Sequence, residues 1–273
     1  MKPDRSPPIT DDAPPAPEGS LVRRLGSGFL RLLGLAAAVI LYLGVAKILA
    51  ILAVRVGADL IEGIDPLLPT DRRPNIGAAS FARRELAADI LLQVNLAILV
   101  LLTAIWRQGA GWRARLALDR TGPNGMRARH LLLILLFWPV LHITWVTGTA
   151  EAFGATFAHG VKLSPTLSAA AVAAWLAYVV IVAPAAEELL IRGEIFAQAR
   201  GFLPPAAAIL VTALLFALAH VSAWGLARPV SLLPLALMLG WLRWRTGRLW
   251  PCIALHGWSN LALIAYVLWP AAG

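Results

Sequence analysis

The chain has 273 residues, of which 59% are hydrophobic and 14% are charged, and its mean hydropathy is +0.73. Water-soluble domains of this size rarely reach such values, so the composition indicates a polytopic membrane protein. The formal net charge is +9. The arginines lie between apolar runs, as membrane topology requires, so nucleic acid is not an expected partner. A single cysteine, Cys252, excludes an internal disulfide and a cysteine-based zinc site.

Apolar segments dominate the chain after a proline-rich start. Residues 1–25 are expected to form a disordered tail. Spanning helices need roughly 17–25 apolar residues, and most of the segments that follow approach this length. We expect an all-α polytopic transmembrane bundle of seven to eight spans, with N-terminal helices over 26–130 and a catalytic helical core over 131–273. The apolar segments lie at about 32–54, 87–106, 131–147, 167–190, 206–224, 229–242 and 249–269.

The arginines predict an orientation. Linkers 107–130, 193–204 and 243–248 are basic, and alternating spans place them on the same side as the N-terminal tail. The positive-inside rule makes that side the cytoplasm, here of the bacterial inner membrane. Linker 55–86 departs from the pattern, because it carries five arginines and yet belongs outside. A re-entrant or surface helix there would explain the departure.

The stretch Ala183–Arg192, read APAAEELLIR, places two glutamates at the end of an uncharged run. Neighbouring helical residues are about 100° apart, so Glu187 and Glu188 cannot point the same way. Glu188 and Arg192 are four residues apart with the acid first, which favours an ion pair. Glu187 is then left without a partner in its own helix. Pro184 cannot donate a backbone hydrogen bond, which frees the carbonyl of Val180.

Two further segments place polar residues at helical spacing. Phe216 and His220 share one helix face, and His256 and Asn260 share another. Each pair alone is explained more simply by an interhelical hydrogen bond. If the helix of Glu187 continues to about residue 199, however, all three polar faces reach similar depth. They can then converge on one cavity in the inner half of the membrane.

At this point the sequence resembles a family. The patterns EExxxR, FxxxH and HxxxN resemble, in order, the signature motifs of the CPBP intramembrane proteases, a family named for CAAX proteases and bacteriocin processing and also called Abi. The resemblance covers about residues 165–265, and the family fold typically has eight helices. The three patterns lie at Glu187–Arg192, Phe216–His220 and His256–Asn260.

The resemblance implies an endopeptidase that cleaves a membrane-associated protein or peptide within the bilayer. Glu187 would be the general base that activates water, and His220 would hold and polarise that water. The developing oxyanion would accept hydrogen bonds from His256 and Asn260. Structural support would come from Glu188, Arg192 and Phe216.

The sequence does not decide whether a metal ion takes part in the reaction. Glu187, His220 and His256 are one carboxylate and two imidazoles, a usual set for catalytic zinc. The family has been described both as metalloproteases and as glutamate proteases without metal, and no HExxH pair is present here. We prefer the metal-free form slightly.

Two other classes of function fit the sequence less well. A scaffold or immunity protein of the same fold would not need the whole polar set, and an ion-coupled transporter would predict paired repeats that the sequence lacks. Four further polar residues lie within apolar runs, where interhelical hydrogen bonds or snorkelling are the favoured explanation. These are Lys47, Gln93, Asn95 and His142.

Overall fold

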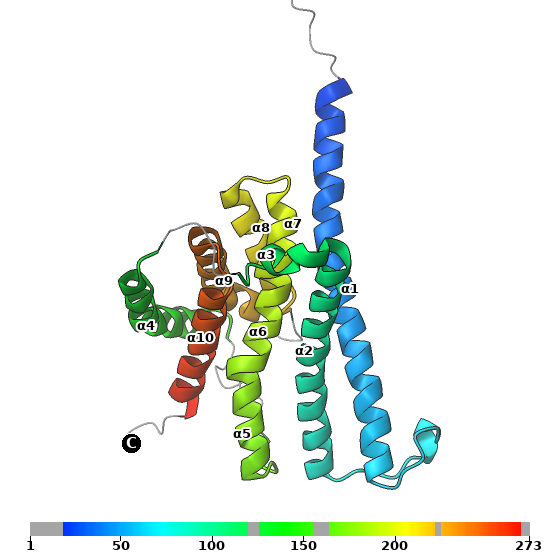
Figure 1. Ribbon diagram of the computed structural model, residues 1–273. Coiled ribbons are helices and arrows are strands. Elements are labelled where there is room, and N and C mark those ends of the chain that lie inside the picture. Colours follow the sequence, from blue (N-terminus) through cyan, green and yellow to red (C-terminus); the bar gives the residue numbers. More distant parts are fainter. Residues whose placement is uncertain (1–18, 120–125, 155–163, 222–224, 269–273) are drawn as a thin grey trace, which may run out of the picture.

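The computed structural model describes residues 19–119, 126–154, 164–221 and 225–268 (Figure 1). These ranges consist of helices and their connections, so the all-α expectation is confirmed. The bounds are α1 Gly19–Ile61, α2 Ala78–Gln108, α3 Trp112–Arg115, α4 Ala128–Ala152, α5 Ala169–Ala177, α6 Ala183–Glu188, α7 Phe196–Arg200, α8 Pro205–Leu218, α9 Ala227–Thr246 and α10 Trp250–Leu268.

Helices α5 to α7 form one continuous helical segment from Ala169 to Arg200. This confirms that the helix of Glu187 extends well past the apolar run. Two wider π-helical turns interrupt the segment, η4 at Tyr178–Val182 and η5 at Leu189–Ile195. Such turns occur mostly as local insertions in α-helices and often at functional sites. Here they flank α6, the short helix that carries both glutamates.

The expected number of spans is not confirmed. Five helical segments are long and apolar enough to cross a membrane by length and composition, so a count of seven to eight is not confirmed. Helix α8 has 14 residues and ends at Leu218, whereas the sequence predicted a segment to residue 224, of which 222–224 lie outside the described residues. The five segments are Gly26–Ile61, Ala78–Arg115, Ala128–Ala152, Ala169–Arg200 and Trp250–Leu268.

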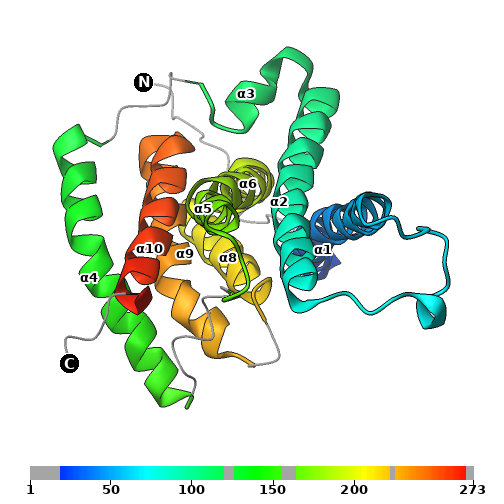
Figure 2. The same ribbon diagram turned by 90° about the horizontal axis from the view of Figure 1, so that it is seen from below.

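The helices do not all run in one direction. Figure 1 shows α1, α2 and α5 along their length, whereas Figure 2 shows α5 and α6 nearly end-on and α4 at full length. Helix α4 therefore lies across the others, and it packs against α9 and α10. Its Trp138 donates a hydrogen bond to Ser259 of α10 at 2.9 Å.

The N-terminal region also differs from the sequence expectation. Helix α1 begins at Gly19, so residues 19–25 are helical and do not belong to the proposed tail; residues 1–18 lie outside the described residues. Linker 55–86 contains no re-entrant helix. Helix α1 continues to Ile61 and α2 begins at Ala78, with only a short 3-10 turn between them, at Thr70–Arg72.

Ion pairs account for two of the five arginines in linker 55–86, Arg73 and Arg84. Asp59 is fully buried and contacts Arg73 at 2.7 Å and Arg84 at 2.8 Å. Arg84 also contacts Glu62 at 2.6 Å, and Ser80 donates a hydrogen bond to Glu62. Paired charges of this kind close the end of the α1–α2 hairpin, and these arginines need not lie in the cytoplasm.

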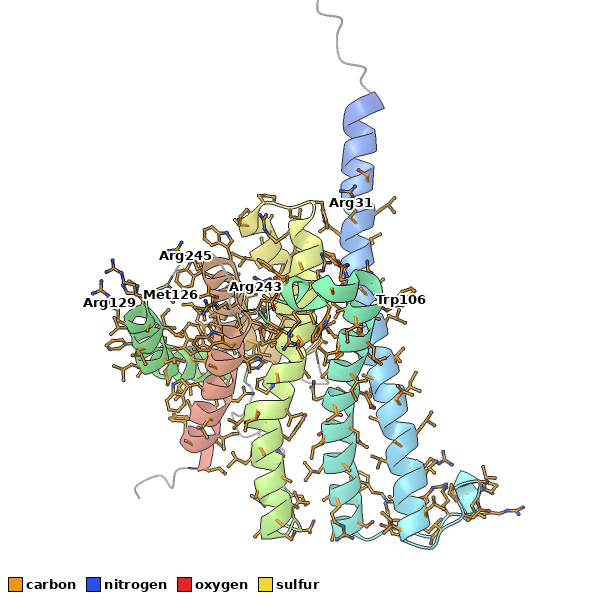
Figure 3. The ribbon with its side chains drawn as sticks, viewed as in Figure 1. Arg31, Trp106, Met126, Arg129, Arg243 and Arg245 are labelled. Atoms are coloured by element: carbon orange, nitrogen blue, oxygen red, sulfur yellow. The ribbon has the colours of Figure 1, made fainter. Side chains whose placement is uncertain are left out.

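The basic connections share one end of the molecule. The start of α1, the α2–α3 connection, the α7–α8 turn and the α9–α10 turn all lie opposite the Thr70–Arg72 turn (Figure 1). Arg31, Arg129, Arg243 and Arg245 lie toward the same end in Figure 3. The predicted grouping of basic segments agrees with this arrangement.

Replacing Arg84 tests whether these ion pairs stabilise the end of the α1–α2 hairpin. Arg84→Met leaves buried Asp59 with one partner and Glu62 without its ion pair, so the melting temperature in detergent should fall by several degrees. Arg72→Met is the matched control, because Arg72 is exposed and its side chain has no partner among the described residues. Equal melting temperatures for the two variants would show that the ion pairs of Arg84 do not stabilise the protein.

Lowering the pH should reduce the stability difference between wild type and Arg84→Met. Hydrogen bonds from Arg84 and Ser80 hold the pKa of Glu62 below its ordinary value of 4.5. A carboxyl whose pKa is lowered by folding stabilises the protein above its ordinary pKa, and this stabilisation is lost as the pH falls through the folded value. The stability difference between wild type and Arg84→Met should therefore shrink below about pH 4.5, as measured by thermal denaturation across a pH series.

Candidate active site

One side chain from each of the three sequence patterns, Glu187, His220 or His256, lies at a common point, as predicted. Glu187 lies in α6, His256 lies in α10, and His220 follows the end of α8. The Nε2 atoms of His220 and His256 are each 3.9 Å from the same carboxylate oxygen, Oε2 of Glu187. Three segments that are distant in sequence thus present polar atoms to one point.

His220 is held differently from the expectation. The sequence placed it on a continuing helix face with Phe216, but α8 ends at Leu218 and His220 lies in the following turn. Its Nδ1 is 2.8 Å from the backbone carbonyl oxygen of Phe216, and the two rings are 4.7 Å apart. A proton on Nδ1 donated to this carbonyl leaves Nε2 of the neutral ring as the acceptor that faces Glu187.

Glu188 joins two of the patterns. Its side chain is fully buried, and its Oε1 accepts hydrogen bonds from Nη1 of Arg192 at 3.0 Å and from Nδ1 of His256 at 2.9 Å. The pair with Arg192 is the one that the spacing predicted. The bond to His256 was not predicted, because helical periodicity says nothing of a residue 68 positions away. A carboxylate on Nδ1 fixes the ring so that Nε2 points at Glu187.

Arg192 and Phe216 pack behind the polar atoms. Arg192 is fully buried, and its Nη2 donates to the carbonyl oxygen of Ala236 at 2.9 Å. Its guanidinium lies 4.7 Å from the centre of the Phe216 ring. That ring also meets the edge of His256, with 5.6 Å between ring centres. These contacts fit the supporting positions that the resemblance implied.

Asn260 contacts the backbone in this structure. Its Nδ2 donates to the carbonyl oxygen of Val179 at 2.9 Å. In the π-helical turn before α6, the N–H of Ala183 bonds to Tyr178, five residues earlier. The next bond in that series would join Pro184 to Val179, and proline has no N–H to donate. Asn260 supplies the missing donor, so it ties α10 to this turn.

Helix α10 comes very close to the same turn at Gly257. A Cβ atom added to Gly257 would lie 2.3 Å from the carbonyl oxygen of Val180. No side chain fits in this space, and only glycine lets the two backbones meet. The close approach brings Asn260 to the carbonyl of Val179, which Pro184 leaves without a helical donor.

Gln93 is a site residue that the sequence did not identify as one. It is buried in the middle of α2, and its Nε2 donates to Oε1 of Glu187 at 3.0 Å. The favoured explanation, an interhelical hydrogen bond, is therefore confirmed, but its partner is the proposed base itself. Because Gln93 occupies Oε1, the other oxygen of Glu187 is left for the two histidines.

A cavity of about 360 Å³ opens beside Glu187. The polar residues Lys47, Gln93, Glu187 and His220 contribute to its wall. The remaining lining is almost entirely apolar and comes from α1, α2, η5 and α8, namely Leu43, Gly44, Leu92, Leu96, Leu190, Ile191, Phe216 and Ala219.

The zinc alternative can be tested against the spacing of these atoms. A tetrahedral zinc ion with bonds of about 2.1 Å places its ligands about 3.4 Å from one another. Both histidine nitrogens lie farther than this from Oε2 of Glu187, at 3.9 Å. Within the described residues, no group of three or more His, Cys, Asp or Glu residues is arranged to hold a metal ion. The donors have the chemistry of zinc ligands but not the spacing.

Gly257→Ala tests the close approach of α10. The added methyl group must push the helix away from Val180, so stability should fall by about 1–3 kcal/mol in a denaturation measurement. Gly148→Ala in α4 is the matched control, because a Cβ there meets open space. Alanine at that position should be neutral or slightly stabilising. Wild-type stability of Gly257→Ala would show that the two backbones lie farther apart.

Comparison with known proteins agrees with this geometry. The family model described as "Type II CAAX prenyl endopeptidase Rce1-like" matches residues 168–262, from the N-cap of α5 into α10. All three sequence patterns lie in this range. No curated protein and no solved structure matches the chain. Residues 168–262, with their converging glutamate and histidines, match this CAAX-type endopeptidase family model, in agreement with the resemblance to the CPBP family.

Proposed function

We propose that the protein is an intramembrane endopeptidase in which Glu187 activates water to hydrolyse a peptide bond of a membrane-associated protein. One observation carries the proposal. A single carboxylate oxygen, Oε2 of Glu187, lies 3.9 Å from two imidazole nitrogens at the wall of a cavity. A separation of 3.9 Å is too long for a direct hydrogen bond, but a water molecule can lie about 2.8 Å from both atoms.

Glu187 is well placed as the base. Gln93 holds Oε1, so Oε2 is free to take a proton from the water that lies against His220. The resulting hydroxide attacks the carbonyl carbon of the scissile bond and forms a tetrahedral oxyanion. The proton on Glu187 then passes to the leaving nitrogen as the C–N bond breaks. The products are a new carboxyl terminus and a new amine.

His256 is proposed as the donor to the oxyanion. Glu188 accepts the Nδ1 proton of His256, and Nε2 of the same ring faces the reaction site. A proton on Nε2 of the ring would donate a hydrogen bond to the oxyanion. Asn260, whose amide binds Val179, acts mainly by positioning α10.

The metal-free form is the one we propose. The spacing of Glu187, His220 and His256 supports it, since a bridging water fits where zinc would need shorter distances. Purified protein should therefore keep its activity after treatment with a strong zinc chelator, measured as cleavage of a quenched peptide. Loss of activity that added zinc restores would assign the reaction to a bound metal.

Replacing each glutamate by glutamine separates the roles of Glu187 and Glu188. Glu187→Gln keeps the shape and the bond to Gln93 but removes the base, so cleavage should stop while the melting temperature stays near wild type. Glu188→Gln leaves Arg192 and His256 without their carboxylate in a fully buried place. Removing one partner of a buried pair costs about 3–5 kcal/mol, so this variant should be strongly destabilised. Stable, inactive Glu188→Gln together with active Glu187→Gln would reverse the assignments.

The function itself is tested in cells. New protein termini in the membrane fraction should appear with wild type and disappear with Glu187→Gln. Glu151→Gln, an exposed position at the end of α4, is the control and should leave the termini unchanged. Identical termini in cells with wild type and with Glu187→Gln would favour a scaffold of the same fold over a protease.

The proposed location is a bacterial inner membrane, with the basic end of the molecule in the cytoplasm. In a Cys252→Ala background, cysteines placed at Arg113 and Arg245 should resist an impermeant thiol reagent in intact cells. Leu67 lies at the opposite end and is 89% exposed. A cysteine at this position, Leu67→Cys, should react with the reagent. The reverse labelling pattern would invert the orientation.

A further inference from the structure

Lys47 is a charged residue in the apolar part of α1. It lies within the span Gly26–Ile61, whose apolar window has a mean hydropathy of 2.5. At 1.5 Å per residue, Lys47 is about 21 Å from the outer end of α1 at Ile61. The apolar core of a bilayer is about 30 Å thick, so this position is deep. Charged residues at such depth are rare and usually mark a binding or transport site.

Lys47 has no counter-charge among the described residues. By contrast, two other basic residues within helices have carboxylate partners: Arg84 with Asp59 and Glu62, and Arg192 with Glu188. No ion pair or hydrogen bond of the Lys47 ammonium occurs in the described ranges. An unpaired ammonium group at membrane depth is costly, and a ligand that brings a negative charge would relieve this cost.

The cavity shows where that ligand would lie. Lys47 and Glu187 line the same cavity, and most of the wall between them is apolar. Lys47 comes from α1, whereas Glu187 comes from α6. A substrate in this cavity would place apolar side chains against the leucines and a negative group near Lys47, while its scissile bond lies at Glu187.

We infer that Lys47 binds a carboxylate of the substrate and thereby determines which peptides are accepted. This inference rests on the proposed endopeptidase function and assigns a specificity residue outside the segment that matches the family model. The carboxylate can come from the C-terminus of the substrate chain or from an acidic side chain close to the cleavage point. Lys47 does not contact the reacting atoms, so its effect is on binding and not on the chemical step.

Binding to an inactive protein separates this inference from catalysis. The full chain with Glu187→Gln is purified in detergent and titrated with a fluorescent farnesylated peptide that ends in Cys-Val-Ile-Met. The peptide is used as the free acid, as the C-terminal amide, and as an amide with Glu in the last place. The free acid should bind about tenfold more tightly than the plain amide, the scale of one hydrogen bond to a charged group.

Changes at Lys47 should alter this preference and little else. Lys47→Met should bind acid and amide alike, and Lys47→Arg should keep the preference for the acid. Arg55→Met removes an exposed positive charge farther along α1, away from the cavity lining, and should also keep the preference. If the Glu-containing amide binds like the acid, Lys47 accepts a side-chain carboxylate; if it binds like the plain amide, the chain terminus is the ligand.

Two results would overturn the inference. One is equal binding of acid and amide by the protein that retains Lys47, and the other is a preference that persists in Lys47→Met. Both leave the role of Glu187 untouched, because that role is measured by cleavage with the otherwise wild-type chain. A chain that binds the acid peptide through Lys47 but cleaves nothing would instead overturn the proposed function.

Discussion

The site depends on one buried carboxylate. Glu188 contacts Arg192 within its own helix and His256 on α10, and it has no exposed surface. Without Arg192 the charge of Glu188 would be unpaired in a dry interior, and without Glu188 neither the guanidinium nor the imidazole would be fixed. The residue beside the proposed base is thus the one that sets the geometry. Glu187 itself is less buried and has fewer constraints, which suits a group that must exchange protons with water.

A second constraint comes from the backbone. Pro184 leaves carbonyls of the preceding turn without helical donors, and the chain responds with a π-helical turn at Tyr178–Val182. Helix α10 meets this turn through Gly257 and through the amide of Asn260. The irregular turn therefore serves as a docking point that aligns His256 with the glutamates. In a regular α-helix Pro184 would leave the carbonyl of Val180 without a donor, whereas in the π-helical turn it is the carbonyl of Val179 that Asn260 binds.

The sequence predicted what local spacing can determine. The i,i+4 pair of Glu188 and Arg192 and the continuation of their helix follow from helix geometry, and the structure confirms them. Contacts between distant segments were not accessible: the bond from Gln93 to Glu187 joins residues 94 positions apart, and an apolar run gives no sign of which glutamine faces a carboxylate. Linker 55–86 looked too basic in part because charge rules ignore the carboxylate partners of Arg73 and Arg84. The count of seven to eight spans is not confirmed, because hydropathy does not detect where a helix such as α8 ends inside an apolar run.

The division of the site between two parts of the chain has a consequence for how such proteins diverge. The segment that matches the family model carries the glutamates and histidines, whereas the α1–α2 hairpin lies outside it and supplies Gln93 and part of the cavity wall. The hairpin is closed at its far end by its own ion pairs. Under the proposed function, evolution can therefore remodel the hairpin as a module and change the accepted substrates, while the groups proposed to perform hydrolysis stay the same.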